Sequence, residues 1–526
     1  MRIQTQGAGS SVVVSGDFPA AAPGDDMDTF TGTLVPIARS FHAASMPYFD
    51  QFAYYCDLAT PLKFDALHAI VNQHASAAAP ADVLRYMCCL FGAYPLAALF
   101  ALIPSPTVKH IVNILLGVFV AQFVFGPSWV HTFIMAAGTY AIVLVAPRRH
   151  LGTIAFVWNM LYLSLSHIYR MYVDYMGVTL EISGAQMVLC MKLTAFAFNY
   201  YDGAVDHARL AELPADSPTL QRVFATRRAL AIASLPSLLE YFSYVYAFTT
   251  FLAGPSFEFR EFIDVVNGTK VPGPGRVRAA VSKFALAMMY LGIGLVAGPH
   301  FPVSYFYDDA VAALPWYQQI PTLYVTFFLF KCRFYGCWTV AEGATVLCGF
   351  GYEGQDAQDK PRWNGVQYMN VLEFELATSH RESTRKWNKI TQGWLEKYIY
   401  TRTHNSLTAT YFVSALWHGF YPGYYVFFMA MPLPTLVNRV AHKRVRPYFL
   451  EADGSEGTTK RIYDVVGGVA NALSIHYIAL PFLILGWDHS IQAYTNLKFS
   501  GHIVLVVLYV LFSLVPLRKD IKTKGD

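Results

Sequence analysis

Long apolar stretches without a charged side chain alternate along this chain with short polar connectors. Residues 111–147 hold no Asp, Glu, Lys or Arg, and about 20 residues suffice to cross a bilayer as a helix. That stretch therefore predicts two membrane-spanning helices, with a break near Gly126-Pro-Ser, because glycine and proline interrupt helices. Similar runs predict further spans at about 86–103, 151–168, 183–200, 233–252, 279–297, 317–332, 336–350, 405–418, 421–437, 463–486 and 499–516.

This pattern predicts one large transmembrane domain with about eleven spanning helices, accompanied by re-entrant or interfacial helices that resemble spans in hydropathy. The domain covers residues 82–516, and residues 31–81 are expected to form interfacial or short helices before it. Residues 1–30 lack a basic region followed by an apolar core, so we interpret them as a disordered polar tail rather than a signal peptide. Residues 517–526 are expected to form a basic cytosolic tail.

Composition agrees with an all-α polytopic membrane protein. The chain is 55% hydrophobic and 14% charged, whereas an ordinary soluble domain has roughly 25% charged residues. A formal charge of +4 without a long basic run argues against nucleic acid as a partner. The seven cysteines form no CxxC pair, and no HExxH or Cys/His spacing is present, so no metal site is expected.

The polar segment 381–402 has six basic and two acidic residues, a local excess of positive charge. If residues 381–398 form one helix, then Arg381, Arg385, Asn388 and Gln392 share a face, because they are spaced by three and four residues. Such a face predicts a site for an anionic, water-borne substrate. A solvated amphipathic helix resting on anionic headgroups explains the same periodicity, and both interpretations stay open at this point.

His418 lies in an apolar run, and a titratable group in hydrocarbon costs free energy unless it has a function or a partner. Gly419 and Pro422 follow it and are expected to end the helix there, exposing backbone in the way that cavity-lining segments do. His131, His167 and His476 also occupy apolar runs, and many such histidines only bond a carbonyl group. Position alone therefore leaves the role of His418 open.

Two motifs together change this picture: WNxxTxxWL at residues 387–395 and WHGxxPGY at residues 417–424. The pair resembles the membrane-bound O-acyltransferase family, in its lysophospholipid acyltransferase branch. Further blocks similar to that branch are Gln186-Met187, Lys192-Leu193, Phe198 to Gly203, Pro236 to Tyr241, Gly254-Pro-Ser and Trp338 to Gly343. The resemblance covers residues 110 to 515 and implies a helical fold around a central reaction chamber.

The resemblance implies transfer of a fatty acyl chain from acyl-CoA to the free hydroxyl, usually sn-2, of a lysophospholipid. His418 is the expected general base, because neutral imidazole, with an ordinary pKa of about 6.5, accepts a proton near neutrality. Asn388 is expected to bind the acyl carbonyl or oxyanion, or to orient the histidine. The expected substrate-binding residues are Arg381, Arg385, Lys389, Trp387, Thr391, Trp417, Gly419 and Glu342.

The expected partners are acyl-CoA as co-substrate, with no other cofactor, the lysophospholipid and the bilayer itself; the sequence leaves a homodimer open. Acylation of a protein or a neutral lipid is the near alternative, and a transporter is the alternative from another class, although no internal repeat supports it. The ending Lys522-Thr-Lys524-Gly-Asp526 resembles a dilysine retrieval signal and predicts the endoplasmic reticulum membrane.

Overall fold

The computed structural model describes residues 44, 47–60, 63–76, 79–177, 179–204, 218–451 and 453–518. The chain divides into two units, residues 1–52 and 53–526, and every labelled helix belongs to the second. The described residues are helical, apart from turns, loops and one isolated bridge between Gln355 and Pro361. The predicted tail 1–30 and the end of the chain from residue 519 lie outside the described residues.

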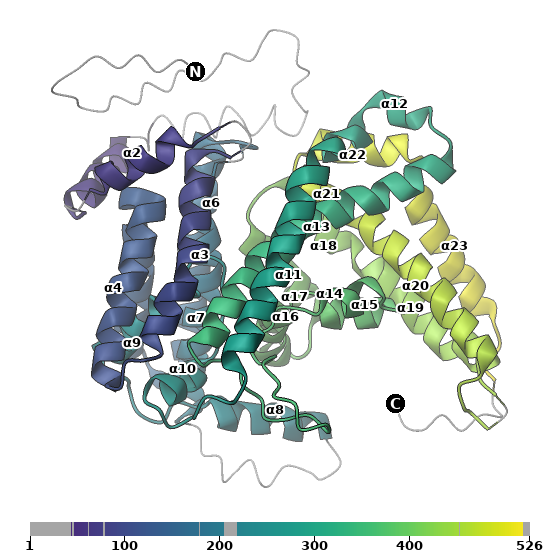
Figure 1. Cartoon of the computed structure of the whole chain (residues 1–526). Helices are drawn as coiled ribbons and strands as arrows, with labels where there is room; N and C mark the ends of the chain where they lie inside the picture. Colours follow the sequence, from purple (N-terminus) through teal and green to yellow (C-terminus); the bar gives the residue numbers. More distant parts are fainter. Residues whose placement is uncertain are drawn as a thin grey trace. The chain divides into compact units, whose positions relative to one another are not determined.

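Several long helices belong to the second unit (Figure 1). They are α3 (Ala81–Phe100), α4 (Pro106–Phe125), α5 (Val130–Val145), α6 (Leu151–Val173), α7 (Ser183–Asp202), α11 (Arg276–Ala297), α13 (Trp316–Leu347), α20 (Thr458–Ile478) and α23 (Ser500–Leu514). Shorter helices connect them and lie between them. They are α2 (Asp65–Gln73), α8 (Pro218–Leu230), α9 (Leu238–Val245), α10 (Phe259–Val266), α12 (Asp309–Ala312), α14 (Val371–Glu375), α15 (His380–Lys386), α16 (Lys389–Trp394), α17 (Leu407–His418), α18 (Pro422–Ala430), α19 (Pro432–Val440), α21 (Leu480–Ile484) and α22 (Trp487–Asn496).

The polytopic helical architecture is confirmed, but the count of eleven spans is not. Within the described residues, five helical segments are long and apolar enough to cross a membrane, or six if the bent pair α22 and α23 is one span. The predicted break at Gly126 is present, because α4 ends at Phe125 and the glycine has a φ of 56°. Several of the other apolar segments are short helices, so length and composition do not identify them as spans.

Four predicted spans differ from the structure for identifiable reasons. The predicted spans 317–332 and 336–350 fall on one continuous helix, α13, which ends at Leu347. Gly336 lies inside this helix and allows close packing against α11, because a Cβ atom there would lie 2.4 Å from Leu291. The predicted span 233–252 contains only the eight-residue helix α9. The predicted span 421–437 is divided into α18 and α19 at Pro432.

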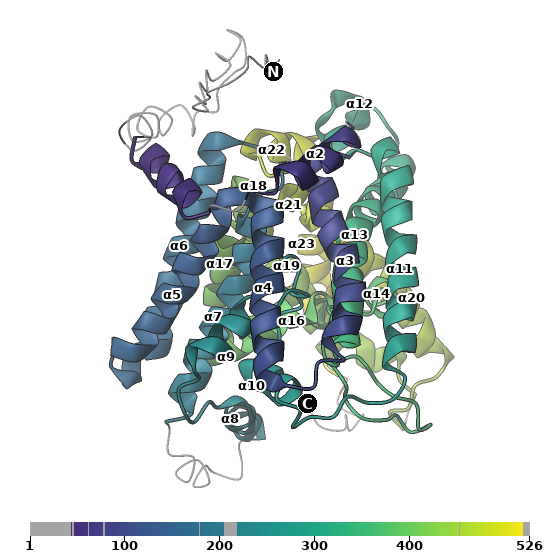
Figure 2. The same ribbon diagram turned by 60° about the vertical axis from the view of Figure 1, so that its left-hand side comes forward.

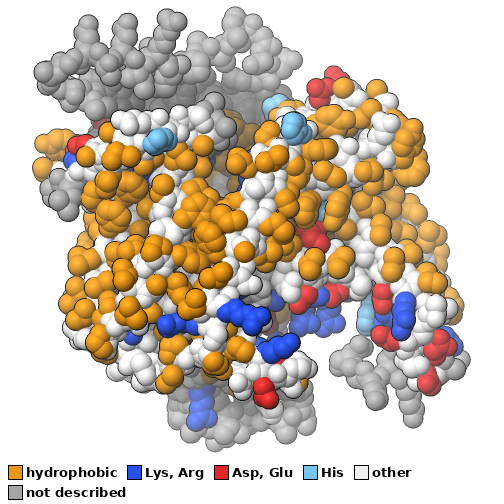
Figure 3. All heavy atoms as spheres, in the orientation of Figure 1, with side chains coloured by type: hydrophobic (Ala, Val, Ile, Leu, Met, Phe, Trp, Pro, Cys, Tyr) orange, Lys and Arg blue, Asp and Glu red, His pale blue; other side chains and the backbone are white. Residues whose placement is uncertain are grey.

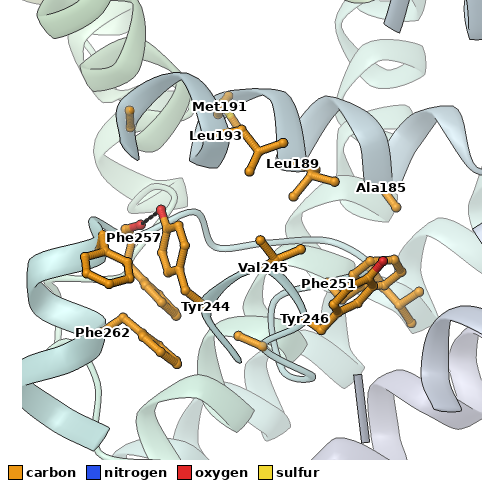
Figure 4. Packing of buried hydrophobic residues seen from close by; sticks show 14 of the residues in the cluster. Ala185, Leu189, Met191, Leu193, Tyr244, Val245, Tyr246, Phe251, Phe257 and Phe262 are labelled. Atoms are coloured by element: carbon orange, nitrogen blue, oxygen red, sulfur yellow. Dashed lines mark hydrogen bonds between the residues drawn. The ribbon is translucent and has the colours of Figure 1, made fainter. Parts of the chain in front are cut away.

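The segment around α9 is apolar because it packs inside the protein. Figure 4 shows Leu189 and Leu193 of α7 facing Tyr244 and its neighbours, and the Tyr244 hydroxyl donates a 2.9 Å hydrogen bond to the Phe257 carbonyl. Lys192 of α7 is also buried and donates to the carbonyl oxygens of Tyr244 and Val245, at the C-terminal end of α9. A cation at that end of a helix is favourable, because the unpaired carbonyl groups carry partial negative charge.

The short helices that carry the two motifs lie among the long ones. In Figures 1 and 2, α14 and α16 are at mid-height, whereas α12 and α22 are near the upper edge and α8 is near the lower edge. On the face drawn in Figure 3, hydrophobic side chains cover most of the surface and most Lys and Arg side chains gather in its lower part. An apolar belt with a basic edge is the surface expected of a membrane protein.

Candidate active site

The Asn388 motif begins at a sharp turn between two short helices and continues through the second of them. The predicted single helix 381–398 is wrong: α15 ends at Lys386, and α16 begins at Lys389. Asn388 stands between them in the left-handed backbone region, with φ 37° and ψ 62°, a conformation that asparagine tolerates better than most residues. The polar stripe expected from Arg381 to Gln392 is therefore interrupted at its centre.

Asn388 is held by its own side chain. Its Oδ1 atom accepts a 3.1 Å hydrogen bond from the Thr391 backbone N–H, so that Asn388 caps the N-terminus of α16. The Thr391 hydroxyl in turn contacts the Met191 sulfur of α7 at 3.5 Å. With Oδ1 occupied, the amide group has its Nδ2 hydrogens left to offer, and no partner for them lies among the described residues.

A buried carboxylate supports the turn from the other side. Glu342 of α13 forms an ion pair with Lys283 of α11 at 2.8 Å, and its second oxygen accepts the Tyr368 N–H at 2.7 Å. The Tyr368 carbonyl then accepts the Lys389 N–H at 2.7 Å, beside Asn388. Both oxygens of Glu342, which we predicted to bind substrate, are thus engaged within the protein.

Aromatic packing fixes the residue that precedes Asn388. The Trp387 ring lies 5.0 Å from that of Phe374, 5.7 Å from Trp338 and 6.2 Å from Tyr335, measured between centroids. Trp338 stacks on Tyr368 at 4.8 Å. Tyr368 is therefore held by its ring, through Trp338, and also by its backbone hydrogen bonds. Trp387, predicted as a substrate contact, packs here against other parts of the protein.

His418 is the last residue of α17, as its glycine and proline neighbours predicted. The helix ends because Gly419 has a φ of 122° and α18 begins at Pro422. The half-buried imidazole contacts the rings of Phe482 at 4.9 Å, Tyr424 at 5.4 Å and Phe428 at 5.5 Å. Within the described part of the chain, neither ring nitrogen takes part in a hydrogen bond, so both are left for a substrate.

Helices α6 and α7 fix the backbone around His418. The Trp417 indole N–H donates to the Met187 carbonyl at 3.0 Å, and the Trp417 carbonyl accepts a 3.1 Å hydrogen bond from Nε2 of His167. A Cβ atom at Gly419 would lie 3.2 Å from the His167 ring, so a larger residue would crowd it. His167 therefore bonds a carbonyl group, which is the second role considered above for histidines in apolar runs.

One aromatic pair joins the two motifs. The rings of Trp394 and Trp417 lie 6.0 Å apart, so the end of α16 packs against the end of α17. No hydrogen bond joins Asn388 directly to His418 among the described residues. The structure thus brings the two motifs together through their tryptophans, with the amide of one and the imidazole of the other unbonded to each other.

The predicted basic contacts lie beside this centre on short elements. Arg381, Arg385 and Lys389 are exposed, and none has a carboxylate partner among the described residues. Lys386, by contrast, forms an ion pair with Glu382 one turn earlier. The Arg381 backbone N–H donates to Asn438 of α19 at 3.3 Å, which fixes the start of α15 and leaves the guanidinium free.

The sequence did not predict the contribution of Lys283, Tyr368 and His167 to this centre. Each acts through a contact between residues far apart in the chain, and a contact of that kind leaves no local pattern. Across the described ranges, no group of three or more His, Cys, Asp or Glu side chains is arranged to hold a metal ion.

Comparison with known proteins shows the family of the chain. The family model of the membrane-bound O-acyltransferases matches residues 167–478, which is more than half of the chain and includes both motifs. The chain belongs to this family. It is therefore an O-acyltransferase of the membrane, and both motifs lie within the part that the family shares.

Individual relatives extend over most of the chain. A lysophospholipid acyltransferase of Schizosaccharomyces pombe is 28% identical over 468 residues, covering 84% of this chain and 88% of the relative. Membrane-bound glycerophospholipid O-acyltransferase 1 of Mus musculus is 30% identical over 462 residues, covering 83% and 91%. A lysophospholipid acyltransferase of Saccharomyces cerevisiae is 29% identical over 467 residues, covering 82% and 74%.

Proposed function

We propose that this O-acyltransferase transfers a fatty acyl chain from acyl-CoA to the free hydroxyl, usually sn-2, of a lysophospholipid. The relatives named as lysophospholipid and glycerophospholipid acyltransferases support the substrate class. The observation that carries the proposal is the His418 imidazole at the end of α17, which is half-buried among aromatic rings and whose two nitrogens have no hydrogen bond to any described residue. A histidine held by rings alone is suited to receive a proton from a lipid substrate.

The reaction needs a proton acceptor because a lipid hydroxyl is a poor nucleophile near neutral pH. One nitrogen of His418 takes the hydroxyl proton as the oxygen attacks the thioester carbonyl, and a tetrahedral oxyanion forms. Collapse of that intermediate breaks the carbon–sulfur bond, and the departing CoA thiolate takes the proton from the imidazolium. Direct transfer of this kind needs no acyl-enzyme, since neither motif contains an activated serine or cysteine.

Asn388 is proposed to donate to the oxyanion. Its Oδ1 atom is occupied by the Thr391 N–H, which turns the donor end of the amide toward whatever fills the site. The hydrogen bonds through Glu342 and Tyr368 hold the turn, so the amide is preorganised before the charge develops. Glu342 is accordingly proposed to position Asn388 instead of touching the substrate.

The remaining predicted residues divide into two groups. Arg381, Arg385 and Lys389 are proposed to meet the phosphates of acyl-CoA, because these exposed cations have no carboxylate partner in the described ranges. Trp387, Thr391, Trp417 and Gly419 are proposed to shape the site through the packing described above. We propose the endoplasmic reticulum membrane as the location, with the basic edge of the molecule on the cytosolic side, following the usual excess of Lys and Arg there.

A substrate panel tests the function. Purified protein is reconstituted in liposomes and incubated with labelled oleoyl-CoA and a set of lysophospholipids, a diacylglycerol, a sterol and a peptide acceptor. We expect labelled diacyl phospholipid that accumulates only when a lysophospholipid is present. Label in a neutral lipid or in peptide would instead assign the alternative acceptors, and uptake of a substrate without any new ester would indicate a transporter.

A further inference from the structure

A second polar feature lies away from His418, where α8 packs against the end of α7. It is a recess of about 400 Å³, including its open mouth. Figures 1 and 2 both place α8 at the lower edge of the molecule, the edge near which basic side chains gather in Figure 3. The lining residues are Asn199, Asp202, Arg222, Val223, Thr226, Arg227, Leu230, Glu396, Lys397, Tyr398, Thr401 and Arg402.

Three of the four cations in the recess are paired with carboxylates. Arg222 pairs with Glu396 at 2.9 Å. Lys397 pairs with Glu258, and Arg402 pairs with Asp202. The fourth cation, Arg227, has no carboxylate partner among the described residues, so the recess keeps an excess positive charge.

Arg227 has weak contacts for a charged group. Its Nη2 atom donates to the Thr401 carbonyl at 3.4 Å and to the Thr401 hydroxyl at 3.5 Å, both long distances for a hydrogen bond. Its Nε atom is buried and has no partner among the described residues, and the same is true of the Nε atom of Arg402. Burial and the neighbouring Arg402 guanidinium lower the pKa of Arg227. Two unsatisfied N–H groups beside an uncompensated charge are costly unless an anion meets them.

The wall of the recess is already ordered. Glu258 accepts hydrogen bonds from the Asn199 amide at 2.9 Å and the Tyr398 hydroxyl at 2.8 Å. The Tyr398 ring stacks on Phe198 at 5.9 Å, and the Arg402 guanidinium lies 4.3 Å above the Phe198 ring. An anion would therefore meet donors that are held in place, which reduces the entropy cost of binding.

We propose that this recess binds a phosphate group, with Arg227 as its principal contact and the Arg402 Nε–H as a second donor. Guanidinium groups recognise phosphate through paired N–H donors, and the chemistry is the same for the phosphates of coenzyme A and for an anionic lipid headgroup. Binding of a coenzyme A phosphate rests on the proposed use of acyl-CoA as the acyl donor. Binding of a lipid phosphate does not depend on that proposal. The recess is continuous in sequence with the Asn388 motif, because Glu396, Lys397 and Tyr398 directly follow Leu395, the last residue of that motif.

Arg227→Gln tests the proposal, and Arg228→Gln is its matched control. Arg228 is the next residue of α8, is exposed and does not line the recess, so the control removes the same charge from the same helix. The full-length variants are placed in phosphatidylcholine nanodiscs, and binding of coenzyme A is measured by equilibrium dialysis. The same variants are then placed in nanodiscs containing phosphatidylinositol, and the shift in thermal unfolding midpoint that this lipid causes is recorded.

We expect Arg227→Gln to raise the Kd for coenzyme A by about tenfold, since one charge-assisted contact is lost, with Arg228→Gln equal to wild type. Loss of the phosphatidylinositol effect in Arg227→Gln alone, with coenzyme A binding unchanged, would support the site and name the lipid as its source. Equal behaviour of the two variants in both measurements overturns the site. If the wild-type protein binds no coenzyme A, the proposal that acyl-CoA is the acyl donor is contradicted. The phosphatidylinositol measurement would still decide whether the recess binds a phosphate group.

A measurement on the wild-type protein covers the case in which Arg227→Gln does not fold. Phenylglyoxal modifies arginines, and mass spectrometry reports its rate at Arg227 and Arg228 separately. Coenzyme A or phosphatidylinositol should slow modification of Arg227 several-fold and leave Arg228 unchanged. Equal rates at Arg227 with and without both ligands would refute the phosphate site.

Discussion

Asn388 and His418 both stand at helix ends, but the two ends are built in opposite ways. Asn388 precedes α16 in a left-handed conformation and is held by polar contacts, namely its own cap and the hydrogen bond between Lys389 and Tyr368. His418 ends α17 and is surrounded by rings, with no hydrogen bond to either nitrogen in the described part of the protein.

Because of this difference, the Asn388 side chain serves both stability and the proposed chemistry, whereas the His418 nitrogens serve the proposed chemistry alone. The cap atom of Asn388 contributes to folding, and the same side chain supplies the proposed oxyanion donor. The nitrogens of His418 contribute no hydrogen bond within the described protein, so their loss removes a proton acceptor and little else. Substitutions at the two positions should therefore give different combinations of effects.

The largest effect is expected at His418. His418→Phe keeps an aromatic ring in contact with Phe482 and Tyr424 but removes the proton acceptor, so kcat should fall by about 10²–10⁴-fold. The thermal unfolding midpoint in detergent should stay close to wild type. Lysophospholipid acylation is measured with labelled oleoyl-CoA, and His131→Phe, in another apolar helix, is the control that should keep its activity. A His418→Phe enzyme with near wild-type kcat would exclude imidazole as the base.

At Asn388 we compare glycine with alanine. Both lose the amide and should lower kcat by about 10²–10³-fold, as removal of an oxyanion donor does. Glycine adopts the left-handed backbone freely, whereas alanine costs about 1–2 kcal/mol there, and the lost cap costs less with glycine than with alanine. Asn388→Ala should therefore unfold at a lower temperature than Asn388→Gly.

The kinetic constants decide between chemistry and binding at this position. If Asn388→Gly raises only the KM for acyl-CoA, the amide binds substrate equally in the ground and transition states, and the oxyanion role is wrong. If the glycine and alanine variants unfold at the same temperature, the backbone conformation of this turn has no part in stability. Either result would mean that Asn388 does not combine a stabilising role with an oxyanion role, which is the proposed difference from His418.

The smallest effect is expected at the exposed cations of α15. The double change Arg381→Glu and Arg385→Glu should raise the KM for acyl-CoA several-fold at low ionic strength and leave kcat unchanged, because solvent-exposed charges are screened by salt. The effect should shrink as salt is added. Arg461→Glu, at an exposed arginine of α20, is the control. A KM that does not respond to salt would count against phosphate binding by α15 and leave the two motifs as the whole site.

The sequence predicted the features that depend on neighbouring residues. The helix end at His418 follows from Gly419 and Pro422, and the break after α4 follows from Gly126 and Pro127. The single helix 381–398 was wrong because periodicity cannot reveal that Asn388 bonds its own backbone three residues later and turns the chain.

Other features depend on contacts that no local pattern carries. The two spans predicted at 317–332 and 336–350 fall on one helix, α13, and Gly336 packs closely against Leu291 of α11. Glu342 looked like a substrate ligand, although Lys283 and Tyr368 occupy its two oxygens. Apolar composition could not distinguish the buried segment around α9 from a span in lipid, because both environments favour the same residues.

The ion pair between Lys283 and Glu342 has a consequence for interpreting natural variants of such enzymes. Lys283 lies more than a hundred residues before Asn388 in the sequence, yet the two are joined through Glu342 and Tyr368 by consecutive contacts. An inherited change of this lysine would leave a buried carboxylate uncompensated beside the turn that carries Asn388. Variants in α11 therefore belong with those of the two motifs when loss of activity is being explained, although no motif search would select them.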